Sequence, residues 1–211
     1  MRKTKDNRAV RALSRQACAL LAAVSLNIPA AWSLATQPAA RAGSQSNHMQ
    51  TARDQGFQEF SQNVDRYQQL RKQVEKRLPS LKSTDNPEAI EAHEHALAAK
   101  IVEARKSAKV GDIFTEKGSA AFRKVIQAAF SGPKGGELYK TIFQGEPLDL
   151  SLRVNQMYPA SLPATTVPPT LLLVLPKLPQ GIEYRVIGRD FALEDVKARL
   201  LIDFIRGVFP L

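Results

Sequence analysis

The spacing of apolar residues changes once along the chain, near residue 145, and this change limits the possible folds. Before it, apolar residues recur every three or four positions, which is the spacing of one face of an α-helix. After it, they alternate with polar residues, as in "LDLSLRV" at 148–154, a pattern typical of a half-buried strand. Helices first and strands last predict an α+β fold: an N-terminal helical hairpin or small bundle followed by a small antiparallel C-terminal sheet.

The first predicted helix carries a long apolar stripe. Its members share a spacing of three or four residues and are Phe57, Phe60, Val64, Tyr67, Leu70, Val74 and Leu78. One interpretation places the stripe in the core, packed against the following helices. The other makes it an association face, for self-association with another copy or for contact with an envelope protein, because a stripe of this length suits a coiled coil.

Two more helices and a short fourth piece complete the predicted helical region, 51–144. The second helix begins at Asp85 or Asn86, either of which can cap it, with Pro87 in the first turn, and extends to about residue 108. The third is expected to be capped by Thr115 or Ser119. The sequence "ELYKTIF" predicts the fourth.

The last third of the chain, 145–211, is predicted to hold a proline-rich segment and the small β-sheet. Within 159–179, "TLLLVL" is expected to form a short helix after Pro169. Residues 182–205 predict a three-stranded meander with a turn at "GRD" and a second reversal near "EDVKA". A helix over 196–209 is the alternative, but β-branching and alternation favour the strand. The residues expected to pack on the helices are Tyr184, Val186, Leu200, Ile202 and Phe204.

The N-terminus has the form of a secretory signal peptide, predicted for residues 1–42. A basic stretch precedes the apolar "ACALLAAVSL", which is too short to cross a bilayer, so no stable membrane span is expected after cleavage. Cleavage after Ala35 or after Ala42 fits the small-residue rule. An uncleaved anchor and a buried cytosolic helix are the alternatives. Residues 43–50 are polar and are predicted to be a disordered leader.

Charge and cysteine content exclude several functions. The formal charge of +10 is concentrated at the N-terminus, since residues 43–211 carry a net charge of only +4. Nucleic-acid binding by the basic "QLRKQVEKR" face is therefore not expected, and export would remove that partner. Cys18 is the only cysteine, so a processed chain would have no disulfide, thiolate nucleophile or cysteine-based zinc site.

The C-terminal half resembles a group of uncharacterised exported bacterial proteins. The resemblance rests on "LRVNQMYP", "VPPTLLLVLPKLP", "EYRVIGRDFALEDVKARLLIDFI" and, upstream, "EARKSAKVGDIFT". It implies a signal peptide, a helical segment, a proline-rich stretch and terminal β-hairpins, and it implies no activity. "YRVIGRDFALEDVKARLLIDFI" is also similar to a small β-unit of periplasmic nickel/cobalt-homeostasis proteins, although Lys197, Ala198 and Arg199 occupy the region of that unit's usual glycine.

The motif "EAHEH" on the second helix is the only candidate metal site in the sequence. Glu91 and His95 are four residues apart and can share a face, whereas His93 and His95 point in different directions. The pair supplies two ligands, and a transition-metal site usually needs three or four from the protein. The simpler interpretation is a solvated helix face with a Glu–His pair, and no cofactor is predicted.

The carboxylates of the last strands are candidates for acid–base catalysis, namely Glu183, Asp190, Glu194, Asp195 and Asp203. Basic residues lie close to them in the sequence, namely Arg185, Arg189, Lys197 and Arg199, and opposite charges on neighbouring strands pair routinely. We therefore interpret the carboxylates as the solvated, salt-paired face of the sheet. Nucleophile and phosphate-loop motifs are absent from the sequence, so no catalytic residue is predicted.

These observations predict an exported, periplasmic or secreted protein that is not an enzyme. Its expected role is binding or scaffolding in the cell envelope. The first alternative is periplasmic metal binding or homeostasis, which "EAHEH" suggests. The second is a hydrolase with an unrecognised carboxylate site.

Overall fold

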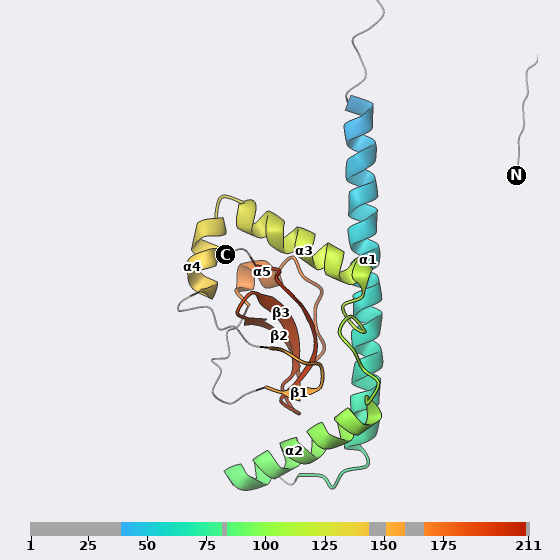
Figure 1. Ribbon diagram of the computed structural model, residues 1–211, viewed down its shortest axis with the longest axis vertical. Coiled ribbons are helices and arrows are strands. Elements are labelled where there is room, and N and C mark those ends of the chain that lie inside the picture. The colour runs from blue at the N-terminus through green and yellow to red at the C-terminus, as the bar shows by residue number, and fades with distance from the viewer. Residues whose placement is uncertain (1–38, 82–83, 144–150, 159–166, 210–211) are drawn as a thin grey trace, which may run out of the picture. The chain divides into compact units, whose positions relative to one another are not determined.

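The computed structural model describes residues 39–81, 84–143, 151–158 and 167–209, with the backbone alone for 39–48. Figure 1 shows the long helices before the long strands in chain order, which confirms the predicted α+β fold. In chain order the elements are α1 (Ala39–Glu75), α2 (Pro87–Ala104), α3 (Glu116–Ser131), α4 (Gly135–Ile142), β1 (Gln156–Met157), α5 (Pro169–Leu172), β2 (Ile182–Ile187), β3 (Asp190–Asp195) and β4 (Leu200–Ile205).

Helix α1 begins earlier than the sequence pattern predicts. It starts at Ala39, so the expected disordered leader at 43–50 is wrong, and only the last four residues of the predicted signal peptide lie within the described chain. Residues 39–78 contain no proline and are rich in Ala, Gln and Arg, which are good helix formers. Once the stripe at 57–78 docks, the helix extends N-terminally at little cost.

The apolar stripe of α1 lies in the core of this chain. Phe60, Val64, Tyr67 and Val74 are buried, and the stripe's other residues pack against them while partly exposed. This favours the core interpretation of the stripe. Among the helices of the described residues, none combines the length and the hydropathy needed to cross a membrane.

The helix starts follow the predicted capping. Asn86 Oδ1 accepts hydrogen bonds from Glu88 N at 2.9 Å and Ala89 N at 3.4 Å, and Thr115 Oγ1 accepts one from Gly118 N at 3.3 Å. Helix α2, however, ends at Ala104 and not near residue 108. The residue after it, Arg105, leaves helical geometry and donates to Ile202 O of the sheet at 3.1 Å.

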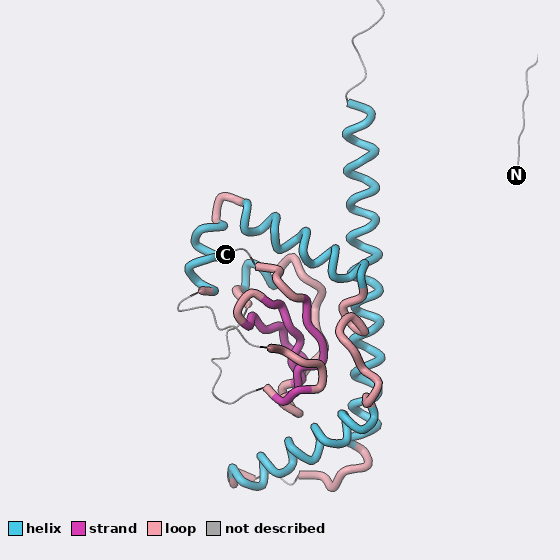
Figure 2. Tube along the Cα trace, viewed as in Figure 1, coloured by secondary structure: helices cyan, strands magenta, loops and turns pink. Residues whose placement is uncertain are grey.

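The strands form one antiparallel sheet in the order β1-β4-β3-β2, drawn in magenta in Figure 2. The predicted meander of β2, β3 and β4 is confirmed, with reversals at 188–189 and 196–199. The predicted strand at 148–154 is wrong in its described part: residues 144–150 lie outside the described chain, 151–154 are not a strand, and β1 covers two residues. Asn155, with φ of 64°, turns the backbone before β1.

A bulge in β4 changes which side chains face the helices. Leu193 pairs with Asp203, but Glu194 pairs with Leu201, so Ile202 is an extra residue. Both Ile202 and Asp203 consequently face the helices. The prediction that Phe204 packs on the helices is wrong, because the bulge moves its side chain to the opposite face, in the cluster that contains Leu201.

An aromatic cluster joins the helices to the helix-facing side of the sheet. The ring centroids of Phe60 on α1 and Phe122 on α3 are 4.7 Å apart, and those of Tyr184 on β2 and Phe191 on β3 are 5.0 Å apart. Phe122 contacts both strand aromatics, with centroid separations of 5.9 Å and 5.7 Å. These contacts place the centre of the core where α1 crosses α3 above β2 and β3.

The crossing of α1 and α3 depends on Gly56. A Cβ at this position would lie 2.6 Å from Lys117 O and 2.9 Å from Ala121 Cβ. We therefore expect Gly56→Ala to lower the free energy of unfolding by about 1–3 kcal/mol, because the helices must separate. Urea denaturation followed by circular dichroism measures the change.

The matched control is Gly136→Ala on α4, where an added Cβ meets nothing within 4 Å. That variant should be as stable as the parent or up to about 1 kcal/mol more stable, through helix propensity. Equal effects of the two substitutions would contradict the proposed close contact.

Candidate functional site

The predicted metal-ligand pair is present but incomplete. Glu91 Oε1 and His95 Nε2 are 3.6 Å apart on one face of α2, and both side chains are more than half exposed. Across the described ranges, no group of three or more His, Cys, Asp or Glu residues is placed to hold a metal ion. The geometry is that of a solvated intrahelical pair.

The predicted solvated face of the sheet is wrong for three of its five carboxylates. Asp195 and Asp203 are fully buried, and Glu194 is 5% exposed. Only Glu183 and Asp190 retain appreciable contact with solvent. The buried position of Asp195 and Asp203 follows from strand register and the bulge, which direct both toward the helices.

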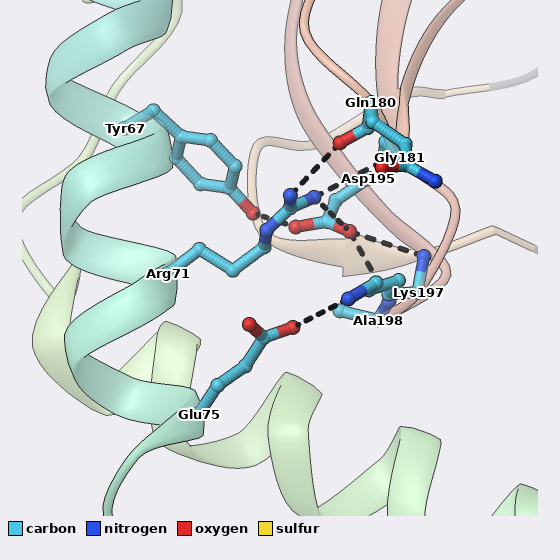
Figure 3. A network of polar contacts seen from close by, with 8 residues as sticks. All are labelled: Tyr67, Arg71, Glu75, Gln180, Gly181, Asp195, Lys197 and Ala198. Atoms are coloured by element: carbon cyan, nitrogen blue, oxygen red, sulfur yellow. Dashed lines mark hydrogen bonds and ion pairs between the residues drawn. The ribbon is translucent and has the colours of Figure 1, made fainter.

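Asp195 accepts hydrogen bonds from α1 and from its own turn (Figure 3). Its Oδ2 accepts from Tyr67 Oη at 2.7 Å, and its Oδ1 pairs with Arg71 Nη1 at 3.2 Å. Oδ1 also accepts from the backbone N–H groups of Lys197 and Ala198, at 3.1 Å and 3.3 Å. The carboxylate therefore joins the first helix to the last hairpin and closes the turn between β3 and β4.

Arg71 extends this network to the segment that precedes β2. Its Nη1 donates to Gly181 O at 3.2 Å and its Nη2 to Gln180 O at 2.9 Å, as Figure 3 shows. Its Nε is buried without a hydrogen-bond partner among the described residues. The guanidinium thus fixes two strand connections to α1, and its charge is neutralised by Asp195.

Arg105, just past α2, forms the second arm of the same network. Its guanidinium lies 5.0 Å from the centre of the Tyr67 ring, and its Nη1 donates to Asn155 Oδ1 at 2.9 Å. Asn155 Nδ2 donates back to Arg105 O at 2.9 Å. Burial lowers the pKa of Arg105, and it raises the pKa of Tyr67 well above the usual value, with the negative charge of Asp195 adding to the increase.

Asp203 is held by backbone N–H groups. Its Oδ1 accepts from Gly111 N at 3.0 Å and from Phe204 N at 2.9 Å. Its Oδ2 accepts from Ile113 N and Phe114 N, both at 2.8 Å. Burial raises the pKa of Asp203, and these four hydrogen bonds oppose the increase. The carboxylate therefore anchors the α2–α3 connection to β4.

The opposite face of the sheet carries an ion-paired triad. Arg185 on β2 pairs with Glu194 on β3 at 2.6 Å and with Glu183 at 2.7 Å. Burial lowers the pKa of Arg185, but the two carboxylates outweigh burial and the net change is upward. The cross-strand pairing expected for Arg185 is thus present, whereas Lys197 pairs with Glu75 of α1 at 3.3 Å.

Each buried carboxylate of the sheet therefore has its charge or its lone pairs satisfied within the protein. Asp195 and Glu194 face arginines, and Asp203 faces four amides. A general acid or base must instead exchange a proton with a substrate within hydrogen-bond reach. These groups are arranged to hold the fold together.

The surface offers a different kind of site beside α5. Leu172, Leu173 and Val174, which we name the 172–174 segment, are exposed apolar residues, and Leu173 is 86% exposed. On one side lies a cavity of about 400 Å³ along β2, named the β2-edge cavity. On the other side, a hollow of about 440 Å³ separates the segment from α1 near Arg53 and Phe57.

Large apolar side chains exposed next to cavities are typical of binding surfaces. The signal was present in the sequence as "TLLLVL", five apolar residues in a row within a proline-rich stretch. A four-residue helix can bury only part of such a run, and α5 buries Leu171 while Leu175 is buried just after it. Comparison of the chain with protein-family models, curated proteins and solved structures found no match.

Asp203→Asn tests the backbone anchor. An amide NH₂ in place of Oδ1 or Oδ2 would face N–H donors, so two hydrogen bonds are lost and buried donors remain unpaired. We expect the free energy of unfolding to fall by about 3 kcal/mol, measured by urea denaturation. Asp190→Asn is the control: Asp190 Oδ1 accepts one exposed hydrogen bond from Gly207 N at 2.8 Å, and the loss should stay below about 1 kcal/mol.

The raised pKa of Tyr67 predicts that the stability of the protein depends on pH in the alkaline range. Its pKa is raised in the folded protein, so above about pH 10 the unfolded chain releases a proton that the folded chain keeps. The free energy of unfolding should therefore fall as pH rises through this range. Tyr67→Phe should make the decline shallower, by up to about 1.4 kcal/mol per pH unit, in denaturation curves between pH 9 and pH 11.5.

Tyr139→Phe on α4 is the control for this measurement, because the Tyr139 side chain is exposed. Its pH dependence should match that of the parent. A Tyr67→Phe variant whose decline is as steep as the parent's would contradict the assignment, whatever its stability at neutral pH.

Proposed function

We propose that the protein is exported and acts in the cell envelope as a non-enzymatic binding or scaffolding protein. The observation that carries the proposal is the 172–174 segment, which exposes three large apolar side chains between two hollows. The N-terminal sequence supports export, because a basic stretch and a short apolar stretch precede small residues.

The arrangement of polar groups supports binding over catalysis. The buried carboxylates described above have partners from the protein itself, and the exposed apolar residues have none in the described chain. Burying such residues against a partner is favourable by roughly 25 cal/mol per Å² of apolar surface, before the costs of association. Burial of the 172–174 segment would therefore contribute favourable free energy to the binding of a partner.

A photo-reactive residue at position 173 tests the proposal in cells. We expect a discrete protein adduct in the envelope fraction after irradiation, because this side chain projects farthest into solvent. The adduct should disappear when Val174→Asp is added, since a charge on the contact surface disfavours burial. The same photo-reactive residue at Leu81, an exposed leucine in the α1–α2 connection, is the control and should give no adduct.

Two results would overturn the proposal. One is a pattern of adducts that is the same at positions 173 and 81. The other is recovery of the protein from the cytosol with Met1 still at its N-terminus, as read by mass spectrometry.

A further inference from the structure

The β2-edge cavity has a lining that is mostly aliphatic. It lies between β2, the edge strand of the sheet, and the chain on both sides of α5. Its aliphatic residues are Val167, Leu172, Pro176, Leu178 and Ile182. Its volume of about 400 Å³ falls within the range of small-molecule sites, which are apolar with a few polar groups that orient the ligand.

Among the described charged residues that line the cavity, only Lys177 lacks a counter-ion. Arg185 is paired with Glu183 and with Glu194, at 2.7 Å and 2.6 Å. In the described part of the chain, Lys177 is exposed and forms no ion pair or hydrogen bond. The Tyr184 hydroxyl is already used, since it donates to Pro176 O at 2.9 Å. The cavity therefore suits a ligand that is mostly apolar and carries one negative charge.

A peptide with an apolar C-terminal residue and an alkyl carboxylate both fit this description. The accessibility of the strand edge distinguishes between them. A peptide ending in an apolar residue would need to pair with the backbone of β2. Val196 N donates to Gly181 O at 3.0 Å, so by alternation the outward-facing backbone groups of β2 belong to Ile182, Tyr184 and Val186. These residues are at most 5% exposed, and Ile182 N already donates to Pro179 O at 3.2 Å. An alkyl chain needs no hydrogen bonds to the backbone of β2, so it fits the aliphatic lining better than a peptide does.

We infer that the β2-edge cavity binds a medium-chain fatty carboxylate, with the alkyl chain against the aliphatic lining and the carboxylate at Lys177. This inference rests on the proposed binding function and names a ligand class for the cavity. The 172–174 segment extends the apolar surface from Leu172, which lines the cavity, to the outside. A ligand that enters over the 172–174 segment would move from that apolar surface to the apolar lining of the cavity.

Calorimetric titration of the protein isolated from cells with sodium dodecanoate, below its micelle concentration, tests the inference. We expect saturable binding of one dodecanoate per chain. Lys177→Gln should weaken it about three- to ten-fold, the effect of losing one charge-assisted contact near solvent. Lys140→Gln on α4 is the matched control and should leave the affinity unchanged. Leu172→Asp, at a partly exposed position, should abolish binding while the circular dichroism spectrum stays that of the parent.

Two further ligands distinguish the contributions of the carboxylate and the alkyl chain. Dodecanol lacks the carboxylate, and a five-residue peptide ending in a leucine carboxylate lacks the alkyl chain. Dodecanol should bind more weakly than dodecanoate and be insensitive to Lys177→Gln. The inference is overturned if dodecanoate does not bind, if both lysine variants behave alike, or if the peptide binds more tightly. Failure here would not affect the adduct at position 173, which reports a protein contact in the envelope, so the two proposals fail separately.

Discussion

A carboxylate removed from water must find donors or a cation, and the arrangement of this protein follows from how Asp195 meets that requirement. Its partners on α1, Tyr67 and Arg71, are 128 and 124 residues away in the sequence. The ionised group would be costly to bury without them. The apolar stripe of α1 and the aromatic rings are part of the buried apolar core. Asp195 determines the position of docking, because its hydrogen bonds to Tyr67 and Arg71 fix where along α1 the sheet lies.

Asp203 does the same for the middle of the chain with a different set of partners. Three of its four donors are backbone amides of the connection between α2 and α3, which has no regular structure of its own. A loop whose amides converge on one buried carboxylate has its conformation fixed. Together, Asp195 and Asp203 attach α1 and the α2–α3 connection to neighbouring strands of one sheet.

Local patterns in the sequence predicted the elements, and long-range contacts determined the site. Asn86, Thr115 and the turn after Ile187 were predictable because capping and turn preferences depend on a few neighbouring residues. The bulge at Ile202 was not, since strict alternation places Asp203 on the solvent side. A signal was nonetheless available: an aspartate with apolar residues on both sides, as in "LLIDFI", suggests a buried carboxylate whose partner is elsewhere.

The dependence of α1 on Asp195 also bears on the order in which the structure can form. During synthesis, Asp195 emerges 124 residues after Arg71, so α1 cannot dock on β3 until then. Contacts this distant in sequence slow folding, because the chain must close a long loop before the interaction rewards it. The docking of α1 on the sheet must therefore wait until β3 has been synthesised, whereas α1 can contact α2 and α3 before that point.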